Sequence, residues 1–98
     1  MDKILDCLRS EFERHEKIEK AVLFGSRARG DFSKLSDYDV AVFGNVEPWD
    51  RSRLRLWVEE ELPTLHKIDL VFVSEIKNAR LLENIDREGI CFYDKIRK

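Results

Sequence analysis

Two aspartates, Asp37 and Asp39, stand one residue apart at the start of the apolar segment 37–43, which reads DYDVAVF. This composition predicts a β-strand, and side chains two positions apart in a strand point to the same face. The two carboxylates are therefore expected to lie close enough to repel each other. A bound cation or a raised pKa relieves such repulsion, which makes the pair a candidate metal site.

A glycine-serine turn, Gly25-Ser26, follows another apolar segment, residues 20–24 (KAVLF), which predicts a buried strand. Residues 27–29 can begin a helical turn, whose first backbone N–H groups attract an anion such as a phosphate. If the two strands pair as neighbours, this turn faces the two aspartates. A phosphate-binding turn beside two carboxylates describes a site for Mg²⁺ and a nucleoside triphosphate.

The spacing of these motifs resembles a known family. Gly25-Ser26, ten intervening residues and then Asp37-x-Asp39 resemble the signature of the polymerase-β-like nucleotidyltransferase superfamily. The fuller string GSRARG…SDYDVAV is similar to its minimal nucleotidyltransferase branch, which includes the MntA-type antitoxins. A lone Asp-x-Asp is a weak motif, whereas the turn, the spacing, the paired aspartates and a third aspartate in a later strand together form a specific one.

The resemblance implies a third carboxylate on a later strand, and Asp69 in the segment KIDLVF stands where it is expected. In that family, two Mg²⁺ ions hold the attacking and leaving oxygens while an acceptor hydroxyl displaces pyrophosphate from a nucleotide. Asp37 and Asp39 would bridge both ions. Asp69 would bind the ion next to the acceptor and help to deprotonate it.

The same resemblance assigns the turn to the triphosphate. Gly25 would let the backbone approach the phosphates, and Ser26 would donate a hydrogen bond to the β- or γ-phosphate. Arg27 and Arg29 diverge on a helix. Arg29 is the preferred phosphate ligand, because Ala28-Arg29-Gly30 matches the pattern of the family.

The partner expected from the resemblance is a protein. Larger nucleotidyltransferases carry further domains that hold the base and the acceptor, whereas these 98 residues are accounted for by one domain, residues 1–98. Either a second subunit completes the site, as a homo- or hetero-oligomer, or the acceptor is itself a bound protein. The resemblance implies an antitoxin that transfers AMP from ATP to a tyrosine of a HEPN-domain toxin.

Two other functions remain open at this stage. The chain could be a non-catalytic module that senses nucleotide and masks the surface of a partner protein. It could also be a small-molecule nucleotidyltransferase of the aminoglycoside type. Nucleotide turnover separates catalysis from binding, and the molecule that gains mass identifies the acceptor.

Composition narrows the functional classes. The net charge of −2 disfavours a general nucleic-acid-binding protein, which usually carries a basic excess. No segment is apolar enough to span a membrane and no signal-peptide pattern is present, so a cytoplasmic protein is expected. Cys7 and Cys91 have no metal-ligand spacing and are predicted to be reduced core residues.

Hydrophobic periodicity predicts an α/β (α+β) fold, a mixed β-sheet flanked by helices. The expected helices cover residues 2–17, 48–62 and 74–88, and the expected strands cover 20–24, 37–43, 67–73 and 90–93, the last at an edge. Convergence of the three aspartates requires the second and third strands to be parallel and the first to be antiparallel to the second. Residues 95–98 are expected to be a solvated tail.

Four apolar residues lack an obvious core position: Phe32, Leu35, Trp49 and Leu56. They can cap a small core individually, because scattered apolar surface residues are common. They can instead cluster at the mouth of the site as a protein interface. Both interpretations stay open on the sequence alone.

Overall fold

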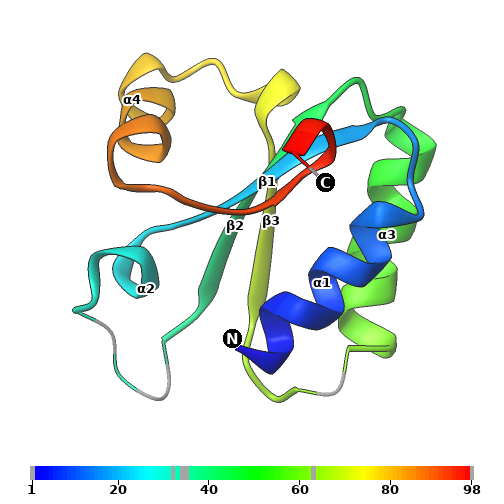
Figure 1. The fold of residues 1–98 in the computed structure, drawn as a ribbon, viewed down its shortest axis with the longest axis horizontal. Helices are drawn as coiled ribbons and strands as arrows, with labels where there is room; N and C mark the ends of the chain where they lie inside the picture. Colours follow the sequence, from blue (N-terminus) through cyan, green and yellow to red (C-terminus); the bar gives the residue numbers. More distant parts are fainter. Residues whose placement is uncertain (1, 32, 34–35, 63, 98) are drawn as a thin grey trace.

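The computed structural model describes residues 2–31, 33, 36–62 and 64–97. Within these ranges the chain forms a four-stranded sheet of order β3-β2-β1-β4, with β2 parallel to β3 and the other pairs antiparallel. Helices cover both faces (Figure 1). The predicted mixed sheet, its topology and its edge strand are confirmed. The elements are α1 (Lys3–Glu13), β1 (Ile18–Phe24), α2 (Ser26–Arg29), β2 (Tyr38–Gly44), α3 (Pro48–Glu60), β3 (Ile68–Phe72), α4 (Ala79–Glu88) and β4 (Ile90–Asp94), with 3₁₀ turns at Val73–Glu75 and Lys95–Arg97.

The larger core lies between the sheet and the helices α1 and α3. Helix α1 contributes Leu5, Leu8 and Phe12, and α3 contributes Leu54 and Val58 at helical spacing. The carboxylate of Asp2 caps α1 by accepting hydrogen bonds from the amides of Ile4 (2.8 Å) and Leu5 (3.3 Å). Helix α1 ends at Glu13, four residues earlier than predicted.

A smaller core lies on the opposite face, where α4 packs against the sheet. It consists of Val22, Phe24, Ala41 and Ile85. The helix predicted from Ser74 begins only at Ala79. Asn78 caps it, because its side-chain oxygen accepts hydrogen bonds from the amides of Arg80 (2.9 Å) and Leu81 (3.3 Å), whereas Ser74 lies in the preceding 3₁₀ turn.

The strand connections place the two helix layers. The crossover from β2 to the parallel strand β3 runs through α3, as predicted. Strand β4 returns beside β1 at the edge of the sheet. In the described part of the chain no helix is long and apolar enough to cross a membrane.

At the C-terminus, Lys95 and Ile96 are exposed, as expected for a solvated segment. Residues 95–97 form a turn, and the ammonium group of Lys95 donates a hydrogen bond to the carbonyl of Glu16 (2.7 Å). The prediction that both cysteines are core residues was wrong for one of them. Both cysteines are free, but only Cys7 packs against the larger core. Cys91 is exposed because it belongs to the edge strand β4.

Two of the four apolar residues without a predicted core position, Trp49 and Leu56, belong to the described part of the chain. Trp49 is 73% exposed and Leu56 is 52% exposed, both on α3. Trp49 lies in the first turn of α3, shortly after β2 ends, whereas Asp39 lies near the start of β2. Trp49 is therefore at the end of the sheet away from the aspartates. Phe32 and Leu35 lie outside the described residues.

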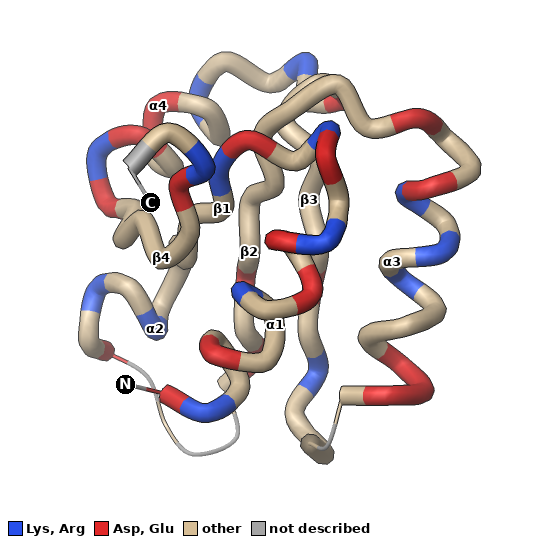
Figure 2. The backbone as a smooth tube through the Cα atoms, turned by 45° about the vertical axis from the view of Figure 1, so that its right-hand side comes forward, with Lys and Arg blue, Asp and Glu red and all other residues tan. Residues whose placement is uncertain are grey.

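Charged residues are interspersed over the surface. Figure 2 shows both signs of charge on each of α1, α3 and α4. The short helix α2 differs, because its charged residues are the two arginines Arg27 and Arg29.

Candidate active site

The three aspartates meet at the end of the sheet where the parallel strands begin. Asp39 and Asp69 stand opposite each other in the register of β2 and β3, and Asp37 immediately precedes β2. Residues in register on adjacent strands project to the same face, so the carboxylates of Asp39 and Asp69 share one face. Asp39 is half-buried, whereas Asp37 and Asp69 are exposed.

The pKa of Asp39 reflects the proximity of the other two aspartates. Burial, followed by the negative charges of Asp69 and Asp37, raises the pKa of Asp39 above its usual value, although Arg29 and Lys67 partly oppose the rise. Protonation is therefore easier for Asp39 than for a solvated aspartate. A cation at this position would relieve the same repulsion.

The donor set fits Mg²⁺ rather than a softer metal, because all three groups are carboxylates. Among the described residues, no group of three or more His, Cys, Asp or Glu side chains is placed so that it could hold a metal ion by itself. Mg²⁺ usually keeps several waters and binds through one or two carboxylates together with the phosphates of a substrate, so it does not require three carboxylates in contact.

Gly25 ends β1 directly beside Asp39. Phe24 and Asp39 are partners in the antiparallel register of β1 and β2, and Gly25 has a φ of 76°, which favours glycine. A Cβ atom at Gly25 would overlap the carboxylate oxygen Oδ2 of Asp39. The glycine is thus required both by its backbone conformation and by the approach of the Asp39 carboxylate, which the sequence did not reveal.

Ser26 is the first residue of the short helix α2 and is half-buried. The carbonyl of Gly25 accepts hydrogen bonds from the amides of Ala28 and Arg29 (both 3.1 Å), and the carbonyl of Ser26 accepts from Gly30 (3.0 Å). These bonds close the turn at the position predicted for it. The hydrogen bond from the Ser26 hydroxyl to a phosphate stays a prediction.

The two arginines of α2 point in different directions. Arg29 pairs with Asp31 (3.3 Å) and with Glu88 of α4 (3.4 Å), and the hydrogen bond with Asp31 raises the pKa of its guanidinium group. To bind a phosphate, Arg29 would exchange these exposed ion pairs, which are individually weak.

Arg27 lies over the ring of Tyr38, with 4.0 Å from its guanidinium carbon to the ring centroid, and its Nε donates a hydrogen bond to the carbonyl of Ser36 (3.1 Å). On the sequence, Arg27 is the less favoured of the two candidate phosphate ligands, and its contact with Tyr38 is not predicted. The signal for this contact was the position of Tyr38 between two outward aspartates, which sends its ring to the opposite face of the strand.

Tyr38 also connects the site to α1. Its hydroxyl donates a hydrogen bond of 2.6 Å to Oδ2 of Asp2. Burial and then the contact with Asp2 raise the pKa of Tyr38 to about 12. Although burial alone raises the pKa of Asp2, the hydrogen bonds from Tyr38 and from the amides of Ile4 and Leu5 hold it below its usual value.

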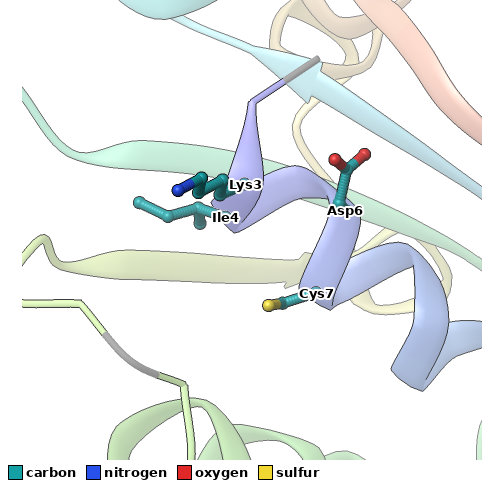
Figure 3. Close-up of a pocket in the computed structure, with 4 residues that line it drawn as sticks. All are labelled: Lys3, Ile4, Asp6 and Cys7. Carbon is teal, nitrogen blue, oxygen red and sulfur yellow. The ribbon is translucent and has the colours of Figure 1, made fainter.

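Two hollows lie near this end of the molecule. One, of about 350 Å³, is lined by Lys3, Ile4, Asp6 and Cys7 of α1, with Lys3, Ile4 and Cys7 extending to the same side of the helix (Figure 3). It includes none of the candidate site residues. The other, of about 170 Å³, lies between α3 and β3 and is lined by residues that include Arg55, Lys67 and Asp69. A molecule in this second hollow would touch the third aspartate.

Residues 7–98 match the family described as Polymerase beta, Nucleotidyltransferase. The match covers most of the chain and includes the glycine-serine turn and all three aspartates. The chain therefore belongs to this nucleotidyltransferase family.

One relative carries a more particular name, "Putative protein adenylyltransferase MJ0604", from Methanocaldococcus jannaschii. It is 38% identical over 45 residues, which cover 46% of this chain and 43% of that protein. The matched stretch thus spans less than half of the relative.

Solved structures share the fold. A mutant of the toxin–antitoxin MntA–HpeT matches with a TM-score of 0.72 and 18% identity, over 95% of this chain and 74% of the other. A complex of the tri-AMPylated Shewanella oneidensis HEPN toxin with MNT antitoxin matches with a TM-score of 0.67 and 18% identity, over 99% and 76%. At this level of identity, the likeness establishes the arrangement of helices and strands only.

Proposed function

We propose that this chain transfers a nucleoside monophosphate, AMP from ATP, to a hydroxyl acceptor in a Mg²⁺-dependent reaction. The observation that carries the proposal is the register of Asp39 and Asp69 on parallel strands, with the Gly25 turn packed against Asp39. Membership of the nucleotidyltransferase family supports the reaction class.

Each carboxylate has a proposed role. Asp37, Asp39 and Asp69 would hold two Mg²⁺ ions, which would neutralise the triphosphate and align the attacking and leaving oxygens. Asp69, which is exposed at the hollow beside α3, would take the proton of the acceptor hydroxyl. The acceptor oxygen forms a bond to the α-phosphorus, the bond to the β-phosphate oxygen breaks, and pyrophosphate leaves.

The phosphate contacts of the proposal come from the turn after β1. Gly25 and Ser26 would bind the β- and γ-phosphates, and Arg29 would neutralise part of their charge. The guanidinium charge of Arg29 lowers the pKa of Asp39, which supports this role for Arg29.

The proposed acceptor is a tyrosine of a HEPN-type partner protein, so the chain would act as an antitoxin. Solved structures with the same fold belong to MntA–HpeT and to an MNT antitoxin bound to a tri-AMPylated HEPN toxin, which supports this choice. The open end of the sheet at Asp37 and Asp69 suits a large acceptor, because both carboxylates are exposed.

The test is to express the chain together with the product of the neighbouring gene, add ATP and Mg²⁺, and determine the mass of both proteins. The expected result is a partner heavier by one or more AMP units. The gain should disappear with Asp39→Asn and persist with Asp86→Asn, an exposed aspartate of α4 that serves as the matched control. AMP transferred efficiently to a free small molecule instead of the partner would contradict the choice of acceptor.

A second function, partner binding without catalysis, is favoured by the exposed Trp49 and Leu56 of α3. In that case Asp39→Asn would neutralise the partner as well as the wild type does, whereas Trp49→Ala would not. Partner activity measured with both variants separates the two functions.

A further inference from the structure

Three side chains that do not belong to the candidate metal site, those of Arg27, Tyr38 and Asp2, make contacts that hold the backbone on either side of Asp37. Tyr38 is only 4% exposed, and its side chain lies on the face of the larger core, opposite to Asp39. Its hydroxyl is bound to Asp2, the residue that caps α1.

Arg27 holds the backbone on both sides of Asp37. Its Nε donates to the carbonyl of Ser36, one residue before Asp37, and its guanidinium group lies over the ring of Tyr38, one residue after it. Arg27 belongs to α2, which begins at the Gly25-Ser26 turn. One side chain therefore connects the turn to the start of β2.

Asp37 needs such support more than Asp39 does. It precedes the first residue of β2 and is exposed, so neither strand pairing nor packing fixes its own position. The nearest fixed point in the backbone is Tyr38, whose amide donates to the carbonyl of Lys67 (2.9 Å). Nearby negative charges also push the carboxylates apart.

We infer that Arg27, Tyr38 and Asp2 are positioning residues that hold Asp37 and Asp39 in the geometry required to bind a divalent cation. The inference rests on the proposed function. Mg²⁺ demands nearly ideal octahedral geometry, so a small displacement of one carboxylate weakens its binding. Residues that orient metal ligands typically change metal affinity by about 10–100-fold when they are replaced.

A direct role of Arg27 with the triphosphate makes a different prediction. A phosphate ligand affects nucleotide affinity and leaves the binding of a metal ion alone unchanged. A positioning residue affects metal binding even when no nucleotide is present.

The experiment therefore measures Mn²⁺ binding to the nucleotide-free protein by electron paramagnetic resonance, with Mn²⁺ as the probe. We expect Arg27→Gln to weaken Mn²⁺ binding by about tenfold or more. Tyr38→Phe keeps the ring beneath Arg27 but loses the bond to Asp2, and it should show a smaller loss. Arg80→Gln, at an exposed arginine of α4, is the control and should bind as the wild type does.

Two further measurements separate positioning from general destabilisation. Asp2→Asn preserves the cap of α1, since asparagine caps as well as aspartate, yet removes the charge that meets Tyr38. Its loss of Mn²⁺ affinity should not add to that of Tyr38→Phe, because both variants break the same contact. In turnover assays kcat should fall while KM for ATP stays within about twofold, as expected when reacting groups are misplaced but substrate still binds.

The outcomes distinguish the two proposals. Wild-type protein that binds no Mn²⁺ and turns over no nucleotide would overturn the proposed function. Wild-type Mn²⁺ binding together with unchanged affinity in folded Arg27→Gln and Tyr38→Phe would overturn the positioning role alone. If Arg27→Gln does not fold, Tyr38→Phe and Asp2→Asn decide the question.

Discussion

A glycine lies at each end of the sheet, and the two glycines differ in what surrounds them. Gly25 ends β1 beside the aspartates, and Gly44 ends β2 at the opposite end; both have a positive φ, 76° and 136°. A Cβ atom at Gly44 would overlap the backbone carbonyl of Lys17 and lie 3.1 Å from the amide nitrogen of Glu19. For a Cβ atom at Gly25, the three nearest atoms among the described residues all belong to the side chain of Asp39, and it would overlap the carboxylate.

This difference indicates that Gly44 has a structural role at its end of the sheet and that Gly25 has a functional role at the other. At Gly44, backbone packs against backbone, which cannot move without disturbing the strand pair Ile18↔Gly44. At Gly25, the glycine makes room for a carboxylate, which could rotate away at little cost to the fold. A substitution of Gly44 should therefore mainly reduce stability, whereas a substitution of Gly25 should mainly weaken metal binding.

The largest loss of stability is expected for Gly44→Ala. The new methyl group meets immobile backbone at a φ that other residues rarely adopt, so the free energy of unfolding should fall by more than about 3 kcal/mol. Urea denaturation measures this loss. Gly30→Ala is the control, because Gly30 also has a positive φ (86°) but open space around its Cβ position. A loss no larger than that of Gly30→Ala would contradict the structural role.

Gly25→Ala should have an intermediate effect on stability and the largest effect on metal binding. Gly30→Ala should cost about 1–2 kcal/mol from its left-handed backbone alone, and Gly25→Ala slightly more, because Asp39 must move. Only Gly25→Ala should weaken Mn²⁺ binding, by about tenfold or more. Equal Mn²⁺ affinity in the two variants would show that the glycine does not position Asp39.

Asp39→Asn should stabilise the metal-free protein slightly at pH 7. The pKa of Asp39 is raised in the folded state, so its ionised form costs stability above the normal value of 3.8. Removal of the charge should raise Tm by less than about 4 °C, which corresponds to roughly 1 kcal/mol in a domain of this size, because the half-buried carboxylate is screened.

Calorimetry from pH 7 down to pH 4 in chelator tests this expectation. The increase in Tm of Asp39→Asn over the wild type should become smaller as the pH falls towards 4. The reason is that the raised pKa of Asp39 lets the wild type take up a proton there and lose the unfavourable charge. Asp86→Asn should show no gain at either pH. A stabilisation that is independent of pH would mean that the charge of Asp39 is not its cause.

The smallest stability effect is expected for Arg29→Gln. The ion pairs of Arg29 with Asp31 and Glu88 are exposed and individually weak, so their loss should leave the free energy of unfolding nearly unchanged. If Arg29 binds the triphosphate, the same variant should bind ATP more weakly by about tenfold or more, because a charged hydrogen bond is lost. Calorimetric titration measures the affinity for ATP, and an unchanged affinity would show that Arg29 does not bind the phosphates.

The sequence by itself determined the sheet and the placement of the aspartates on it. Strand periodicity put Asp37 and Asp39 on one face, and the requirement that Asp69 meet them predicted a parallel pair joined by α3. The parallel pair and the register of Asp39 with Asp69 agree with the prediction, because the alternation of side chains and the length of a crossover are local properties. The start of α4 was missed because two cap residues, Ser74 and Asn78, compete within a few positions.

Only the tertiary structure decided how the candidate site is supported. The contact of Tyr38 with Asp2 joins residues 36 positions apart, and the approach of Asp39 to Gly25 depends on the register of two antiparallel strands. The exposure of Cys91 likewise depends on its strand lying at an edge. Side-chain chemistry and local spacing do not contain such information, because packing between distant segments fixes which groups meet once the whole chain has folded.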